Sequence, residues 1–216
     1  MSAATVPVYV EVGTKRVFAS AIDWPGWSRS GKDEKAALEA LAAYAERYAP
    51  VARLARLSFE PEVDFKVVER LKGDGSTDFG VPHLPTRGDW EKLSTSDAGR
   101  IGALLAASWK TFDATAAKAP AELRKGPRGG GRDRDKIVAH VLEAEGAYVP
   151  QIGLRMKPAP PGDTTGIKAF RAAILGVVKA SAGKKPAADM KWPVPYAARR
   201  IAWHALDHAW EIEDRS

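Results

Sequence analysis

Two of the four histidines of this 216-residue chain lie close together near its C-terminus. His204 and His208 are four positions apart in the segment YAARRIAWHALDHAWEIEDR, whose apolar residues repeat with the period of a helix. Side chains at this spacing share one face of a helix, with about 5–6 Å between their Cβ atoms. Ile201 and Ile212 extend this face, so we expect it to point inward. The two imidazoles are therefore either neighbours in a packed core or ligands of a common group.

A third histidine falls on the apolar stripe of another expected helix. His140 shares the stripe of residues 133–153 with Ile137 and Tyr148. Imidazoles from facing helices can hold a metal ion in a helical bundle, and three of them leave coordination positions open for water or substrate. The alternative is three ordinary core histidines, but buried imidazoles without partners would each cost about 1–3 kcal/mol. We therefore predict a divalent metal ion, of the kind that imidazoles suit: Zn, Ni or Fe.

Carboxylates near these histidines have two interpretations. Glu143 follows His140 by three residues and is a candidate proton acceptor, and Asp207 directly precedes His208. Either carboxylate could instead orient an imidazole from behind, as carboxylates often do around metal sites. Glu211 could approach the metal or belong to a charged helix end. The alternative for all three is an ordinary solvated charge.

The composition limits the chemistry and the compartment. The chain has no cysteine, which excludes disulfides, thiolate metal ligands and a cysteine nucleophile, so any reactive thiol has to come from outside. Its apolar runs are shorter than the ~20 residues that span a bilayer, and the N-terminus does not resemble a secretory signal. We expect a cytoplasmic protein without a membrane partner.

The net charge of +6 points to anionic partners. One basic cluster, RKGPRGGGRDRDK at 124–136, is interrupted by glycines and aspartates, so we expect a solvated loop. It does not match a phosphate-binding loop, because no strand precedes it and no Gly-Lys-Ser/Thr follows. No groove-reading element accompanies the charge, which argues against nucleic acid and favours a small-molecule substrate, anionic in character.

The chain changes from strand periodicity to helix periodicity. Residues 6–12 and 16–22 alternate as a hairpin with its turn at 13–15, a short third strand is expected at 27–29, and a further strand at 63–71. Between them, residues 34–48 have the pattern of a helix that Pro50 ends or kinks. Four amphipathic helices follow, at 95–119, 133–153, 163–183 and from 193 onward. We predict an α+β two-domain protein: a small β-β-(β)-α-β domain at 1–72, a linker at 73–92, and an all-α up-down four-helix bundle at 93–216.

The order of histidines resembles that of a known family. His140 in DKIVAHVLEAE and the pair in AWHALDHAWE are similar to the pattern of the DinB/YfiT-like family, whose members are four-helix bundles with a divalent metal on three histidines. The resemblance covers about residues 90–216. It implies that His140, His204 and His208 are the metal ligands. It also implies a thiol-dependent S-transferase or isomerase that uses a low-molecular-weight thiol such as mycothiol or bacillithiol, or a metal-dependent hydrolase, and a homodimer.

The N-terminal half has its own resemblance. The hairpin followed by DWPGWSRSGKDEKAALEALAAYAERY is similar to the HicB-like antitoxin fold, over about residues 5–72. Antitoxins of that type carry a separate DNA-binding module, and neither a ribbon-helix-helix nor a helix-turn-helix signal is present here. The domain is then an attached module or a dimerisation surface. This leaves a second hypothesis, a non-catalytic binding or regulatory protein.

Two further expectations concern aromatic and linker residues. Trp203 and Trp210 are seven residues apart and share a helix face, so we expect core packing or an interface with the N-terminal domain. Substrate stacking is the alternative. His83 lies between prolines in the expected linker and is predicted to be exposed.

Overall fold

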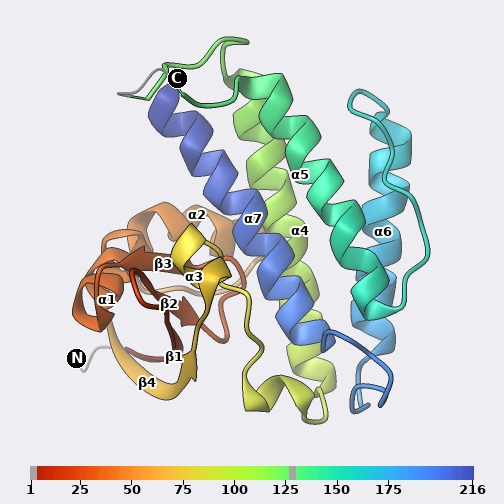
Figure 1. Cartoon of the computed structure of the whole chain (residues 1–216). Helices are drawn as coiled ribbons and strands as arrows, with labels where there is room; N and C mark the ends of the chain where they lie inside the picture. The colour runs from red at the N-terminus through yellow and green to blue at the C-terminus, as the bar shows by residue number, and fades with distance from the viewer. Residues whose placement is uncertain (1–3, 127–129) are drawn as a thin grey trace.

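The computed structural model describes residues 4–126 and 130–216 and has mixed α/β architecture (Figure 1). A four-stranded sheet has the order β3-β2-β1-β4, formed by Ala4–Val12 (β1), Val17–Ala21 (β2), Ser28–Gly31 (β3) and Val63–Lys72 (β4). The predicted hairpin is confirmed, since β1 and β2 pair antiparallel with Val10 opposite Ala19. β4 pairs parallel to β1, so the chain has to cross over between them.

The crossover from β3 to β4 contains two short helices where one was predicted. These are α1, Glu34–Ala43, and α2, Ala45–Leu54. Asp33 caps α1 by accepting a hydrogen bond from the Ala36 amide at 2.8 Å. The break falls at Tyr44, and Pro50 lies inside α2 instead of ending the helix. The break directs the Tyr44 ring onto Trp210, with 5.1 Å between ring centroids, so a long-range contact stabilises it.

The segment predicted as a linker contains regular structure. Helix α3 spans Gly75–Phe79, and a 3-10 helix, η1, spans Arg87–Trp90. The segment encloses the fully buried Glu11, which accepts hydrogen bonds from the Thr77 hydroxyl at 2.5 Å and from the amides of His83 and Leu84. A buried carboxylate needs such partners, and this requirement orders the segment. His83 is accordingly not freely exposed: its ring is 23% exposed, and Nε2 lies 2.9 Å from Asp74 Oδ1.

Four long helices, α4 to α7, follow in the rest of the chain and confirm the predicted helical segments (Figure 1). They are α4, Thr95–Lys118; α5, Arg134–Tyr148, extended by the 3-10 helix η2 at Val149–Ile152; α6, Thr164–Ala180; and α7, Val194–Arg215. Helix α7 packs on both α4 and α5, and α6 packs on α4. Ion pairs tie three of them together, with the buried Arg171 of α6 between the buried Glu145 of α5 and the exposed Asp113 of α4. Among the described residues, no helix combines the length and apolar character needed to cross a membrane.

Helix α7 is shared between two hydrophobic clusters. One cluster fills the space among the four long helices, and the other joins the sheet, α1 and α2 to Leu206 and Trp210 of α7. The expected interface role of the tryptophans is confirmed, because Trp203 meets Phe18 of β2 with 6.1 Å between ring centroids and Trp210 meets Tyr44. The contact is close at Gly26, where φ is +94° and an added Cβ would lie 2.6 Å from Leu206. One helix thus carries the sheet on one side and the histidines on another.

Candidate metal centre

The three predicted histidines converge between α5 and α7. The ring centroids of His140 and His204 are 5.0 Å apart, those of His140 and His208 are 5.1 Å apart, and those of His204 and His208 are 4.6 Å apart. One nitrogen of each ring lies within 4.8 Å of the corresponding nitrogens of the other two. Donors this close together can bind one ion, because ligand nitrogens about 2.0–2.1 Å from a tetrahedral Zn²⁺ lie well within that spacing of one another. The sequence prediction of their convergence is confirmed.

The three histidines are buried to different degrees, and within the described part of the chain the most buried one lacks a hydrogen-bond partner at one ring nitrogen. His204 is 8% exposed, whereas His140 and His208 are half-buried. Nδ1 of His204 is buried and has no hydrogen-bond partner among the residues that the structure describes. A buried imidazole without a hydrogen-bond partner is costly, and a metal ion held among the three rings would give His204 a ligand bond. The donor set therefore fits a divalent ion that prefers imidazole.

The surroundings lower the pKa of two of the imidazoles. Burial lowers the pKa of His204 well below its usual 6.5, and the charges of His208 and Arg200 lower it further. Burial likewise lowers the pKa of His140, with Arg132 as the next contributor. Metal ligation requires a free lone pair on each ring, so suppression of protonation favours binding.

Glu211 is the carboxylate that contacts a histidine of the cluster. Its Oε2 lies 2.7 Å from Nδ1 of His208, and its Oε1 accepts a hydrogen bond from Arg215 at 2.5 Å. The hydrogen bond with His208 is the main reason why the pKa of Glu211 is lowered. With Nδ1 engaged, Nε2 of His208 is the nitrogen left for a metal ion, an arrangement common in metal sites. Glu211 thus lies beside the histidine cluster and also belongs to the charged end of α7.

Asp207 and Glu143 occupy different positions from Glu211. Asp207 does not orient an imidazole: it pairs with Arg29 of β3, whose Nη2 is 2.6 Å from Oδ1. The reason is helical geometry, since Asp207 and His208 are consecutive and point in different directions. Glu143 is exposed on α5, and its charge raises the pKa of His140 against the effect of burial. Its part in proton transfer stays a prediction.

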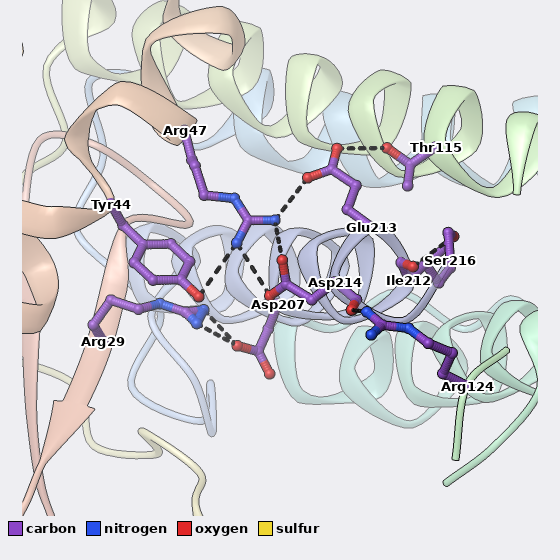
Figure 2. Close-up of polar contacts among 10 residues, drawn as sticks. All are labelled: Arg29, Tyr44, Arg47, Thr115, Arg124, Asp207, Ile212, Glu213, Asp214 and Ser216. Carbon is purple, nitrogen blue, oxygen red and sulfur yellow. Dashed lines mark hydrogen bonds and ion pairs between the residues drawn. The ribbon is translucent and has the colours of Figure 1, made fainter. Parts of the chain in front are cut away.

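Two arginines from the N-terminal half of the chain bind acidic side chains of α7 (Figure 2). Arg29 binds Asp207, and its guanidinium carbon lies 4.1 Å from the centre of the Tyr44 ring. Arg47 of α2 binds Glu213 at 2.8 Å and Asp214 at 2.9 Å, nearer the C-terminal end of the helix. Sequence reasoning missed these pairs, which join residues more than 160 positions apart.

No family model matches the chain, and neither a curated protein nor a solved structure is significantly similar to it.

Proposed function

We propose that this chain is a metal-dependent enzyme with a divalent ion, Zn, Ni or Fe, on His140, His204 and His208. The observation that carries the proposal is the convergence of three imidazoles whose most buried member has an unpartnered Nδ1. Closed structural zinc sites use four protein ligands, whereas three ligands leave a position for a reacting molecule. The half-buried positions of His140 and His208 support access from solvent.

The reaction we propose is thiol-dependent S-transfer or hydrolysis. A bound divalent ion would lower the pKa of a water or thiol and polarise a substrate. The chain contains no cysteine, so a thiol nucleophile would be an external low-molecular-weight thiol. Glu211 would hold His208 in position, and Glu143 would accept a proton at the edge of the site. This assignment draws on the resemblance to the DinB/YfiT-like family, of which we propose the chain is a distant member, with a four-helix bundle at 93–216 and a HicB-like module before it.

Metal content by elemental mass spectrometry of untagged protein tests the centre. We expect about one metal ion per chain in the wild type and little in His140→Ala, His204→Ala or His208→Ala. The matched control is His83→Asn, which changes the fourth histidine of the chain outside the cluster and should keep the metal. Absence of metal from reconstituted, folded wild type would contradict the proposal.

Turnover decides between the enzyme and the non-catalytic alternative. The metal-loaded protein would be screened with mycothiol and bacillithiol against electrophilic acceptors, and with ester and amide substrates for hydrolysis. Activity that disappears in His204→Ala and falls in Glu143→Gln at unchanged metal content would support the enzyme. A fully loaded protein that turns over nothing in either screen would favour a binding or regulatory protein.

A further inference from the structure

Arg200 differs from the other buried arginines of the described chain. Three arginines are less than 9% exposed: Arg171, Arg199 and Arg200. Arg171 pairs with Glu145 and Asp113, and Arg199 pairs with Asp89 at 2.5 Å. Arg200, which is 8% exposed, forms no ion pair with any described carboxylate, and its Nη1 is buried without a hydrogen-bond partner.

The Arg200 guanidinium lies beside the histidine cluster. Arg200 is one helical turn before His204 on α7, and its Nη2 donates to the Tyr148 hydroxyl at 3.1 Å. The Tyr148 ring in turn lies 6.0 Å from the His204 ring. The guanidinium carbon is 4.7 Å from the Trp203 ring centre and 5.2 Å from that of Tyr148. Tyr148 thus links the Arg200 guanidinium to the edge of the candidate metal centre.

Aromatic contacts only partly satisfy a buried guanidinium. Cation–π attraction offsets some of the cost of removing the charge from water, but a guanidinium has five N–H donors, and buried charges are ordinarily paired. A cavity that Arg200 lines with Arg199 and Trp203 has a volume of only about 10 Å³, which is room for at most a single water. This cavity is too small for a polyatomic anion, so an anion bound by Arg200 would have to lie outside it.

We propose that Arg200 and Tyr148 form an oxyanion subsite next to the metal centre, which holds the carboxylate or phosphate group of a small anionic substrate. Guanidinium groups bind both oxyanions through paired N–H donors, and the Tyr148 hydroxyl has a hydrogen to donate. This inference rests on the proposed function only in that the bound anion would then react at the metal centre. Binding of the anion itself needs only the side chains of Arg200 and Tyr148. It names the substrate class: a molecule with a negatively charged oxyanion on one side of its reacting group.

Isothermal titration calorimetry with three probes tests the subsite. Succinate, inorganic phosphate and uncharged succinamide would be titrated into full-length protein, both zinc-loaded and chelator-treated. We expect at least one oxyanion to bind both forms and succinamide to bind neither. Arg200→Met should weaken oxyanion binding by about 10-fold or more, because a hydrogen bond to a charged group contributes about 1.5–3 kcal/mol. The preference between succinate and phosphate identifies the substrate's oxyanion.

Two further variants separate the subsite from charge and folding effects. Arg87→Met removes one positive charge from a 96% exposed side chain and should leave binding unchanged. Tyr148→Phe deletes only a hydroxyl and should weaken binding less than Arg200→Met, while circular dichroism confirms the fold. If Arg200→Met does not fold, Arg200→Lys takes its place and is compared with Tyr148→Phe. The arginine variant should again weaken oxyanion binding more than the tyrosine variant does.

The outcomes distinguish the subsite from the metal proposal. Oxyanion binding that depends on Arg200 in chelator-treated protein supports the subsite even if no metal is ever found, in which case only the proposed function fails. Oxyanion binding that requires zinc and is equal in wild type and Arg200→Met would overturn the subsite, since the metal alone would be the receptor. Absence of oxyanion binding in both forms would overturn it as well.

Discussion

At the residue scale, a chain of contacts fixes His208. Arg215 holds Glu211, and Glu211 holds Nδ1 of His208. Removal of such a supporting carboxylate typically costs 10–100-fold in metal affinity, so we predict that Glu211→Gln weakens zinc binding by about 10-fold. Competition with a zinc-binding dye measures the affinity. Glu213→Gln is the matched control, since this exposed carboxylate contacts Arg47 instead of a histidine. Equal affinities in the two variants would contradict the role of Glu211.

The buried His204 predicts a pH dependence of stability. Its pKa is lowered in the folded chain, so the unfolded chain binds the proton more readily. The free energy of unfolding of chelator-treated protein should therefore be fully maintained above the ordinary pKa of 6.5 and fall as the pH decreases below it. Between pH 7.5 and pH 5, we expect protonation of His204 to lower the free energy of unfolding by about 1–2 kcal/mol.

Urea denaturation of wild type and His204→Gln across this pH range measures the effect. The loss toward pH 5 should be smaller in the variant than in the wild type, whereas Arg87→Met should retain the wild-type slope. Parallel curves for wild type and His204→Gln would show that protonation of His204 is not the cause.

The histidines could be predicted from the sequence because spacing alone decides which side chains share a helix face. His204, His208 and His140 all follow this rule. The same rule could have predicted that Glu211, and not Asp207, contacts His208. A residue three positions after His208 lies on the same side of the helix as His208, whereas the residue directly before it does not. Arg200 was not predicted, since its lack of a carboxylate is evident only when every neighbour in space is known.

At the element scale, β3 positions the turn of α7 that bears the histidines. Arg29 of β3 is 14% exposed and binds Asp207, directly before His208. We predict that Arg29→Met lowers the free energy of unfolding by about 1–2 kcal/mol through the lost charged hydrogen bonds. It should also weaken zinc binding several-fold. Arg47→Met is the control, because Arg47 joins the same two parts of the chain beyond the histidines. It should destabilise the fold and preserve zinc affinity, and equal losses of affinity would refute the positioning role.

Element boundaries were least predictable where distant residues determine them. The sequence predicted one helix over 34–48, but contacts of Tyr44 with Trp210 and Arg29 accompany a break that no local signal marks. The segment over 72–89 lacks periodicity, yet buried Glu11 orders it through Thr77 and two amides. Strands and long helices, by contrast, follow from local hydrophobic patterns and caps such as Asp163, which accepts a hydrogen bond from the Gly166 amide.

At the scale of the whole molecule, the two hydrophobic clusters meet in α4 and α7. Leu104 and Leu206 are fully buried in the sheet-side cluster, while Leu105 and Ala205 beside them belong to the cluster among the long helices. Unfolding of the sheet side would expose one face of both helices to water. Because apolar burial contributes about 25 cal/mol per Å², this exposure would destabilise the helices as well.

We therefore predict a single cooperative unfolding transition for the full chain. Far-UV circular dichroism, which follows mainly the helices, and hydrogen exchange of β1 and β2 amides should give the same free energy of unfolding. Leu206→Ala should lower both values together by about 2–5 kcal/mol, as expected for a cavity in a packed core. A sheet whose amides exchange at a much lower free energy than the helices unfold would contradict this coupling. The histidine site would then be independent of the N-terminal half, and the effect expected for Arg29→Met on zinc affinity would disappear with it.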